Sequence, residues 1–588
     1  MIKKILFGAA IVAVAVIACK KDGSMGPQAG KDNAAFLVYE NSFLESFWKL
    51  NPDMATLEGY HKYDSILFVP NDDYRSKIIN FTKIQIDSLS RFEVNTLNDA
   101  NRIDYHIMQN QVEYMQWQIQ QYKDYQWDPG QYNVGSTFAY ILNEPYAPLE
   151  KRLRNFYEKM SNIPAYYKEA EKQIKNPVPE LTNLAIEDCE GGLSIFEKDY
   201  TDSLNKSNIP KATQKLMLDR AHLTTETIQG YTIWLKNQKT DHGKSFRLGK
   251  ELYEEKFKYE IQSDLTALKL YNLAFEQKAK IHGSMFKISK QLWPKYFGKS
   301  PMPHDSLETI AKMIDTLSSK HVSASGYQGA IERLIPKLTN FVKTKDLLTI
   351  DPSKPLNVRK EPAYMAGVAD ASMSAPGPYE KGGRSYFNVG SLNGWSAEKA
   401  ESYLREYNQY ILQILCIHEA IPGHYVQQVY ANKSTSLINA VFGNNAMIEG
   451  WAVYAEELML DNGYENDSPE MRLMWYKWHL RSVCNTILDY SVHVNNMSKN
   501  DAIKLLTYEA FQQPAEAESK WKRVSVTSVQ LDSYFSGYQD IIDLRELYKQ
   551  KMGEKYKLKE FNEKFLSFGN APVKFIKEAM LSKGSGNQ

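Results

Sequence analysis

The sequence has little cysteine, no excess of charge of either sign, and no internal run of apolar residues long enough to cross a bilayer. Only four of its 588 residues are cysteines, so we expect no disulfide framework, and stability must come from a large buried core. The 71 basic and 70 acidic residues leave a net charge of +1, which lacks the basic excess that holds a phosphate backbone. Nucleic acid is therefore not an expected partner. With 43% hydrophobic and 24% charged residues, the composition is that of a globular protein.

The N-terminal segment predicts export and a lipid anchor. Two lysines precede an apolar run that ends at Ala18, which is short for a membrane span, and Cys19 follows directly with charged residues behind it. A small residue before a cysteine resembles the bacterial lipobox, in which the cysteine is lipidated and becomes the mature N-terminus. We expect a signal peptide over residues 1–18, a lipidated Cys19, a flexible tether over 19–33 and attachment to the bacterial cell envelope at the outer membrane. The alternative is an apolar core helix at the start of the chain.

From residue 34 onward, the spacing of apolar residues predicts long helices, because apolar side chains recur at every third or fourth position between prolines. The exception is the segment 351–395, which is rich in Pro, Gly and Ser. Within it, the β-prone stretch 385–390 predicts a small sheet or an edge strand. We predict a mainly α protein, a large helical body with a cleft, in which residues 34–349 form a helical N-terminal half and residues 350–588 carry the chemistry.

The most informative motif is a pair of histidines that bracket a glutamate, His418-Glu419-Ala-Ile-Pro-Gly-His424. In the zinc-peptidase motif H-E-x-x-H, the i, i+4 spacing places both imidazoles on one helix face, and the glutamate acts as general base. Here the histidines are six positions apart, so a regular helix would turn the second about 240° away from the first. Pro422 has no N–H for the carbonyl one turn back, and Gly423 tolerates unusual dihedral angles. We therefore expect a local distortion that returns His424 to the site.

A third metal ligand is expected from Glu449, in the segment Glu449-Gly-Trp-Ala-Val-Tyr-Ala-Glu456. Two histidines and one glutamate leave a coordination position open, as in catalytic zinc sites. Glu456 lies two turns further along the same helix face and can orient a histidine as an outer carboxylate. The alternative for either glutamate is a solvated helix face. Together these residues predict one Zn²⁺ per chain, bound by His418, His424 and Glu449, with Glu419 as the general base.

These motifs resemble those of the bacterial family called domain of unknown function 885, which is metallopeptidase-like and related to helical zinc peptidases such as angiotensin-converting enzyme. The likeness extends over nearly all of the mature chain and includes Asn51–Asp64, Leu248–Tyr253, the Asp489 and His493 pair, and the set Arg523, Gln530, Tyr534 and Gly537. The last set matches the family pattern R-x6-Q-x3-Y-x2-G. The chain departs from the family pattern at Asn485, Ser528, Val529 and Asn562; the family usually has Pro-Gly where Ser528 and Val529 stand.

The resemblance also implies roles for residues outside the metal motif. Related zinc peptidases use a downstream Tyr and His to stabilise the oxyanion of the reaction, and Tyr534 and His493 occupy the matching positions. Asp489 is the expected outer carboxylate, unless it only holds His493 in a structural hydrogen bond. Arg523 either clamps a substrate carboxylate or belongs to a buried pair. Asn388, in the β-prone stretch, is expected at an edge that binds an extended peptide substrate, unless the stretch is a hairpin that only covers the cleft.

These patterns predict a membrane-anchored zinc peptidase that hydrolyses peptide bonds. The rival prediction is a non-catalytic helical lipoprotein that binds nutrients or glycans through its many Tyr and Trp residues. Such a protein has no need of a metal-binding set of two histidines and two glutamates. A third prediction, a pseudo-enzyme that keeps the fold without the metal, requires the loss of a ligand, and every expected ligand is present in the sequence.

Cys19→Ala is expected to abolish lipid attachment, because the cysteine thiol is the group that accepts the lipid. The variant should lose globomycin-sensitive processing and should no longer partition into the detergent phase of a Triton X-114 separation. Cys189→Ala serves as the control and should behave like the wild type. A Cys19→Ala protein that is fully processed and stays in the membrane fraction would contradict the lipobox prediction.

Overall fold

The computed structural model describes residues 27–238, 243–361, 371–380, 382–434 and 436–582, so the predicted signal peptide and Cys19 lie outside the described part. The first helix, α1, spans Pro27–Leu50. Residues 27–33, predicted as the end of a flexible tether, therefore belong to this helix. The side-chain oxygen of Asn33 accepts hydrogen bonds from the Asn98 backbone N–H and the Asn101 amide, both at 2.9 Å, which ties the start of α1 to the start of α4.

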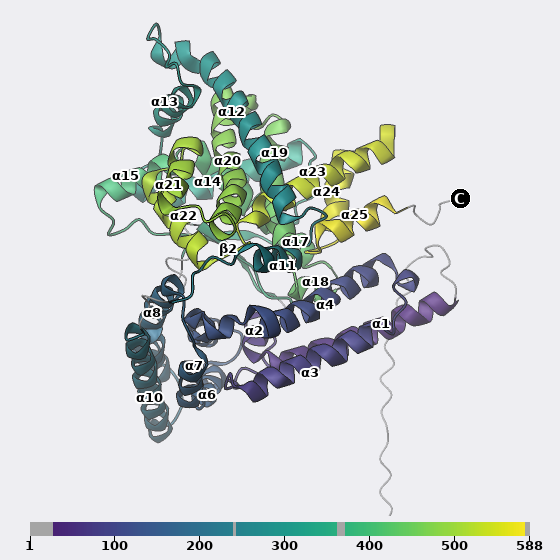
Figure 1. Cartoon of the computed structure of the whole chain (residues 1–588), viewed down its shortest axis with the longest axis vertical. Helices are drawn as coiled ribbons and strands as arrows, with labels where there is room; N and C mark the ends of the chain where they lie inside the picture. The colour runs from purple at the N-terminus through teal and green to yellow at the C-terminus, as the bar shows by residue number, and fades with distance from the viewer. Residues whose placement is uncertain (1–26, 239–242, 362–370, 381, 435, 583–588) are drawn as a thin grey trace, which may run out of the picture.

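The part of the chain before residue 350 is helical, as predicted; in Figure 1 its later helices α12, α13 and α14 lie in the upper part of the body, and most of the earlier ones form two groups. Helices α1, α3 and α4 run along the lower edge of the body, and α6 to α10 form a bundle at its lower left with a hydrophobic core of its own. The helices are α1, α2 Pro52–Leu57, α3 Asp72–Leu89, α4 Asp99–Trp117, α5 Gly135–Asn143, α6 Leu149–Met160, α7 Ile163–Gln173, α8 Pro179–Ser194, α9 Tyr200–Asn205, α10 Lys211–Lys236, α11 Lys250–Ile261, α12 Ala267–Phe297, α13 Ser306–Ser318 and α14 Tyr327–Thr344. Prolines stand at or beside the starts of α2, α8 and α10, because the residue before a proline avoids the helical region.

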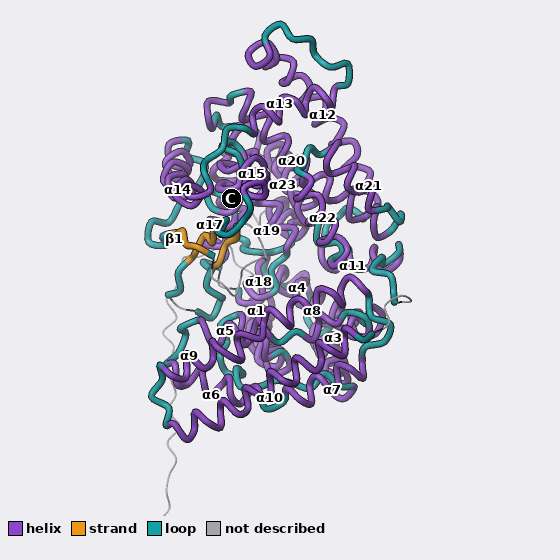
Figure 2. The backbone as a smooth tube through the Cα atoms, turned by 90° about the vertical axis from the view of Figure 1, so that its left-hand side faces the viewer, coloured by secondary structure: helices purple, strands orange, loops and turns teal. Residues whose placement is uncertain are grey.

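The predicted small sheet is present and consists of β1 Leu356–Lys360, β2 Ala371–Ser374 and β3 Ser385–Val389. The strand order is β1-β3-β2, with β3 parallel to β1 and antiparallel to β2, and Figure 2 shows the strands beside α17. Because β3 has a partner on both sides, the prediction that residues 385–390 offer a free edge is wrong.

Asn388 lies inside this sheet and not at a substrate edge. Its side chain is fully buried, donates to the hydroxyls of Ser372 and Ser374, and accepts from Arg359 Nε at 2.7 Å. All three contacts join neighbouring strands. The predicted substrate-binding role of Asn388 is therefore corrected to cross-strand bonding, since a buried amide with three partners is not available to a ligand.

The second half of the chain builds the rest of the body from helices. They are α15 Ala397–Glu406, α16 Ile411–Glu419, α17 His424–Ala431, α18 Leu437–Val441, α19 Asn445–Asp461, α20 Pro469–His493, α21 Lys499–Lys504, α22 Pro514–Val526, α23 Asp532–Met552, α24 Leu558–Leu566 and α25 Val573–Leu581. The segment between Ser396 and the histidine motif forms two helices, α15 and α16. Asn408 separates them, because its side-chain oxygen accepts from the N–H groups of Tyr410 and Ile411 and caps α16.

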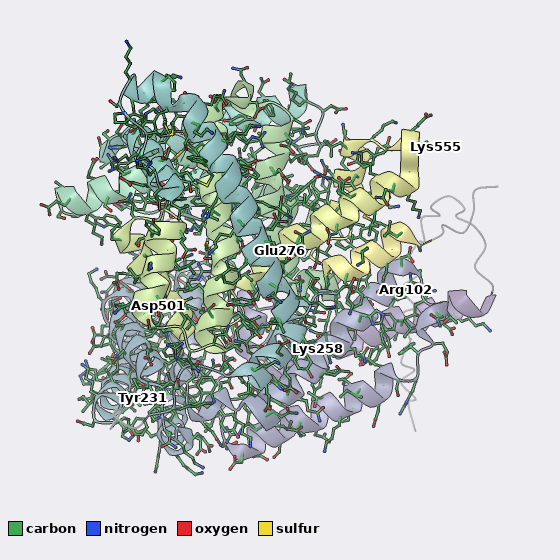
Figure 3. The ribbon with its side chains drawn as sticks, turned by 45° about the horizontal axis from the view of Figure 1, so that its top comes forward. Arg102, Tyr231, Lys258, Glu276, Asp501 and Lys555 are labelled. Atoms are coloured by element: carbon green, nitrogen blue, oxygen red, sulfur yellow. The ribbon has the colours of Figure 1, made fainter. Side chains whose placement is uncertain are left out.

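One hydrophobic core joins helices from both sides of the predicted boundary near Thr349. It includes Phe36 of α1, Leu270 of α12, Trp451 of α19 and Phe561 of α24. Side chains fill the spaces between these helices in Figure 3, and the labelled Asp501 and Lys555 are exposed. Within the described residues, none of the helices has the length and apolar character that a membrane span requires.

The closest helix pair at the centre of the body is α19 and α23, which meet at two glycines. A Cβ on Gly537 would lie 1.6 Å from the Ala446 carbonyl oxygen, and a Cβ on Gly450 would lie 2.3 Å from the Gly537 carbonyl carbon. Only glycine permits this approach. Since α19 carries Glu449 and α23 carries Tyr534, the glycine contact sets the spacing between two predicted site residues.

Gly537→Ala is expected to lower stability by about 1–3 kcal/mol or more, because the added methyl overlaps a helix backbone that cannot move aside. Gly283→Ala is the matched control: Gly283 lies in the interior of α12 with nothing within 4 Å of its added Cβ, so alanine should stabilise by about 0.5–1 kcal/mol. Thermal unfolding followed by circular dichroism measures both. Equal midpoints for the two variants would contradict the close packing of α19 and α23.

Candidate metal centre

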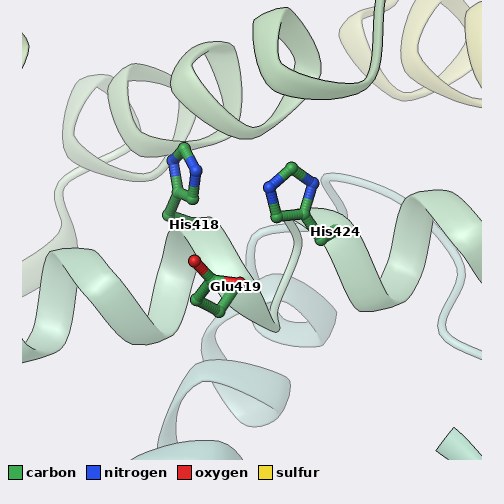
Figure 4. A group of neighbouring side chains, drawn as sticks. All are labelled: His418, Glu419 and His424. Carbon is green, nitrogen blue, oxygen red and sulfur yellow. The ribbon is translucent and has the colours of Figure 1, made fainter. Parts of the chain in front are cut away.

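The distortion predicted between the two histidines is a complete break in the helix. Helix α16 ends at Glu419 and α17 begins at His424. Between them, the N–H of Gly423 bonds the Ile417 carbonyl at 2.9 Å, which folds the chain back on itself. A Cβ on Gly423 would lie 1.8 Å from the His418 carbonyl oxygen, so only glycine fits this turn. The turn therefore returns His424 to the neighbourhood of His418, as Figure 4 shows.

The predicted metal ligands come together around one carboxylate oxygen. His418 Nε2 lies 3.5 Å and His424 Nε2 lies 3.4 Å from Glu449 Oε2, and the two imidazole rings are 4.8 Å apart. Glu419 is part of the same group: one carboxylate oxygen of Glu419 and one nitrogen of each histidine all lie within 4.8 Å of one another. Among the described residues, His418, Glu419 and His424 are the group of His, Cys, Asp and Glu side chains whose donor atoms lie close enough together to share a metal ion.

The protonation of this group shows how strongly its members interact. Burial by itself would lower the pKa of His418, but the carboxylates of Glu449 and Glu456 raise it to about 10. Burial would likewise raise the pKa of Glu449, yet His418 and His424 hold it below its usual range. Glu449 is thus an anion between two imidazoles, one of which keeps a proton. A cation bound here would take the place of that proton.

The donor set fits a zinc ion. Glu449 Oε2 is buried and makes no hydrogen bond among the described residues, although two imidazole nitrogens lie within 3.5 Å of it. A buried carboxylate oxygen that faces two imidazole nitrogens without a hydrogen bond is incompletely satisfied, and a divalent cation shared with the two nitrogens would bind it directly. Two His nitrogens and a Glu oxygen are ligands that zinc prefers, and three protein ligands leave a fourth position open.

Glu456 and Trp478 form the outer support of His418. The predicted contact of Glu456 is present: Glu456 Oε1 lies 2.7 Å from His418 Nδ1. The same oxygen accepts from Trp478 Nε1 at 3.0 Å, and burial raises the pKa of the Glu456 carboxyl. With its Nδ1 engaged, His418 presents Nε2 to Glu449. Sequence reasoning missed Trp478, because it comes from α20 and no motif links it to the histidines.

Tyr534 lies beside the histidines, as the resemblance implied, and Arg523 holds its hydroxyl. The Tyr534 ring is 6.4 Å from the His418 ring, and Arg523 Nη2 donates to Tyr534 Oη at 3.3 Å and to Gln530 Oε1 at 2.6 Å. Since the phenol oxygen accepts from Arg523, its own hydrogen is available to another acceptor. Burial and the nearby Glu449 raise the pKa of Tyr534 to about 12, which keeps that hydrogen in place.

His493 and Asp489 lie in a different place and support the loop between α22 and α23. His493 Nε2 is 2.9 Å from the carbonyl oxygens of both Val524 and Thr527 and 3.8 Å from Asp489 Oδ1. The structure does not bring His493 to the histidine pair. Its position does not fit the predicted direct role in catalysis, whereas it fits a structural role in which His493 fixes the loop that leads to Tyr534.

Asp489 anchors an unusual backbone conformation in that loop. Its carboxylate accepts from the N–H groups of Val529 at 3.0 Å and Leu531 at 3.2 Å, and from the Tyr253 hydroxyl at 3.1 Å. Val529 has φ of 68°, a left-handed conformation that costs a β-branched residue energy and that glycine adopts freely. This explains why the family usually has glycine at this position. Asp489 therefore acts on the loop backbone, and the predicted role as an outer carboxylate of the metal site does not fit its contacts.

The molecule also contains a cavity of about 540 Å³, whose lining includes none of His418, Glu419, His424, Glu449 and Tyr534. It lies between α4 and α11 on one side and the 526–530 loop and the start of α19 on the other. Gln530, which bonds Arg523, lines it, and so does Asn445, one helical turn before Glu449. Amide and phenol groups such as Asn110, Gln111 and Tyr114 share the lining with the charged Asp124, Asp128, Lys256 and Glu260.

Comparisons with known proteins agree with the family resemblance. The family model described as "Bacterial protein of unknown function (DUF885)" matches residues 52–580. A "putative lipoprotein of unknown function" from Shewanella oneidensis is 47% identical over 93% of this chain and 100% of its own, with a TM-score of 0.86. A "putative lipoprotein" from Colwellia psychrerythraea shares the fold, with a TM-score of 0.75 at 15% identity, over 93% of this chain and 98% of its own. No curated protein matches the chain.

Asp489→Ala is expected to lower stability by about 2–4 kcal/mol, because two buried N–H groups lose their acceptor, whereas the Tyr253 hydroxyl keeps Asp532 at 2.7 Å. Asp543→Ala is the control, since Asp543 is exposed and accepts only from the neighbouring Gln539; its effect should stay within about 0.5 kcal/mol. Chemical denaturation gives the stability, and hydrogen exchange of residues 524–531 locates the change. Unchanged exchange in this loop would contradict the anchoring role of Asp489.

Proposed function

We propose that this chain, which belongs to the bacterial protein family of unknown function DUF885, is a zinc-dependent peptidase. The observation that carries the proposal is the convergence of His418 Nε2 and His424 Nε2 on the unsatisfied Glu449 Oε2, with the Glu419 carboxylate beside them. In this proposal His418, His424 and Glu449 hold one Zn²⁺. A bound Zn²⁺ supplies Lewis acidity, which lowers the pKa of water towards about 7 and polarises a carbonyl group.

Glu419 is the group that moves the proton. It follows His418 in sequence, and its carboxylate lies in the same group as the two histidine nitrogens without bonding either ring. Burial raises the pKa of Glu419, so its carboxylate is a stronger base than an exposed one. We infer that Glu419 takes a proton from the attacking water and returns it to the nitrogen of the leaving amine.

Tyr534 stabilises the negative charge that forms on the carbonyl oxygen. Its hydroxyl hydrogen is not used within the site, because Arg523 donates to the hydroxyl oxygen and does not accept from it. Arg523 also orients the ring, since it bridges Tyr534 and Gln530. A phenol fixed in this way can donate to an oxyanion without reorganisation, which is the condition for strong stabilisation.

The cavity lined by Gln530 suits an extended peptide. Asn and Gln side chains both donate and accept hydrogen bonds, as the backbone of a peptide does, and the tyrosines add flat apolar surface. The same lining favours a second candidate function, the binding of glycans without catalysis, because amides and aromatic rings also bind sugars. The metal ligands and Glu419 support the peptidase proposal over this rival.

We further infer that the mature chain is anchored to a membrane through a lipid on Cys19. The lipobox-like sequence supports this anchor, and two structures with the same fold are described as lipoproteins. The peptide substrates would then be those of the bacterial cell envelope, and the outer membrane is the proposed location.

Two variants separate metal binding from catalysis. Glu419→Gln keeps the shape of the side chain and removes the base, so zinc content should stay at about one per chain while turnover falls by roughly 10²–10⁴-fold. His424→Ala removes a ligand, so zinc content, turnover and melting temperature should all fall, because a metal that binds only the folded state stabilises it. Zinc is measured by elemental analysis, and cleavage by mass spectrometry of a mixed peptide library.

Chelator-treated and zinc-restored wild-type protein are the controls for this experiment. Equal cleavage by the wild type and Glu419→Gln would refute the role of Glu419 while leaving the metal site in place. Full zinc occupancy in His424→Ala would refute the ligand set. No cleavage by the zinc-loaded wild type, together with tight binding of an oligosaccharide, would favour the glycan-binding rival.

A further inference from the structure

Lys520 is a buried basic residue without a partner among the described residues. Its side chain is 4% exposed, and it makes no hydrogen bond or ion pair among the residues that the structure describes. It lies on α22, three residues before Arg523, so the two side chains leave the same face of the helix. Burial and the nearby Arg481 lower the pKa of Lys520 well below its usual range. The neutral amine is therefore favoured in the empty site, and an anion beside Lys520 would stabilise the ammonium form.

The acidic groups nearby are already paired with other cations. Glu406 lies 2.8 Å from Lys477, and Glu516 is bonded by Arg481. Both glutamates are within electrostatic range of Lys520, but neither forms an ion pair with it. The two carboxylates therefore pair with Lys477 and Arg481, and neither pairs with Lys520.

Arg523 also has no carboxylate partner in the described structure. Its bonds go to the neutral side-chain oxygens of Gln530 and Tyr534. Lys520 and Arg523 thus stand on one helix face, and Arg523 contacts Tyr534, whose ring is 6.4 Å from that of His418. This basic site lies next to the reaction centre, and the nearby carboxylates pair with other cations. Such a site favours the binding of an anion.

We propose that Lys520 and Arg523 form the subsite that binds a carboxylate of the substrate. The proposal rests on the peptidase function above and names the substrate class: peptides that carry a carboxylate close to the bond that is cleaved. Since one extended residue spans about 3.4 Å, Arg523 lies within two or three residues of that bond. A free C-terminus supplies such a carboxylate, as does an acidic side chain, and both present the same chemistry to the subsite.

Binding to the zinc-loaded Glu419→Gln protein tests the proposal without turnover. Three probes are compared by titration calorimetry: N-acetyl-tetra-alanine as the free acid, the same peptide as the amide, and N-acetyl-Ala-Ala-Ala-Glu amide. The free acid should bind about 10–100-fold more tightly than the tetra-alanine amide, which is the range for a charge-assisted hydrogen bond. Tight binding of the third probe as well would show that acidic side chains are also accepted.

Lys520→Met should remove the preference for the carboxylate in the same assay. Lys522→Met is the matched control, because Lys522 lies two residues away on α22, is exposed and pairs with Glu187 at 2.6 Å. It should keep the preference. The melting temperature of Lys520→Met should be equal to or above that of the parent, because the change removes a buried amine that has no hydrogen-bond partner among the described residues. A purely structural lysine would alter the affinity for acid and amide alike.

The outcomes distinguish this proposal from the proposed function. Equal affinity for the free acid and the amide, or no binding of either, overturns the carboxylate subsite even if the wild type cleaves peptides. A preference for the acid that survives Lys520→Met also overturns it. An acid preference that Lys520→Met abolishes, in a protein that cleaves no peptide of the library, supports the subsite and rejects the peptidase.

Discussion

The contact between α19 and α23 is the constraint on which the rest of the site depends. The helices touch backbone to backbone because Gly450 and Gly537 leave no side chain between them. Helix α19 carries Glu449 and Glu456 on one face, and α23 begins with the turn that holds Tyr534. A wider helix spacing would separate the carboxylate that faces the two histidines from the phenol beside them. The packing of the core and the geometry of the site are therefore one and the same feature.

Around this contact, the structure concentrates charge that the apolar core cannot solvate. Glu449 and Glu456 are matched by His418 and its neighbours, and Asp489 is matched by backbone N–H groups of the loop before α23. Each buried anion thus has a partner that also positions a functional group. The basic side chain of Lys520 is buried without a partner among the described residues, and this observation points to a ligand.

The histidines and glutamates of the site could be predicted from the sequence because they belong to two short motifs along the chain. The six-residue spacing brings His418 and His424 together only if the helix breaks between them, at Pro422 and Gly423. The two glutamates of α19 are two turns apart on one helix face. The predictions for Asn388 and His493 did not fit the structure. The sequence does not show that β3 has partners on both sides, or that the carbonyls of Val524 and Thr527 come to lie beside His493.

The sequence by itself determined the helical class, the break between the histidines, and which residue types are available to hold a metal, because periodicity and turn chemistry depend on neighbours along the chain. Only the tertiary structure decided which helix faces meet. Trp478 of α20 donates to Glu456, and Arg523 of α22 donates to the Tyr534 hydroxyl. Lys520 is buried near two glutamates that pair with other cations. These contacts join residues from different helices, and their distances follow from packing across the whole core, which no local pattern records.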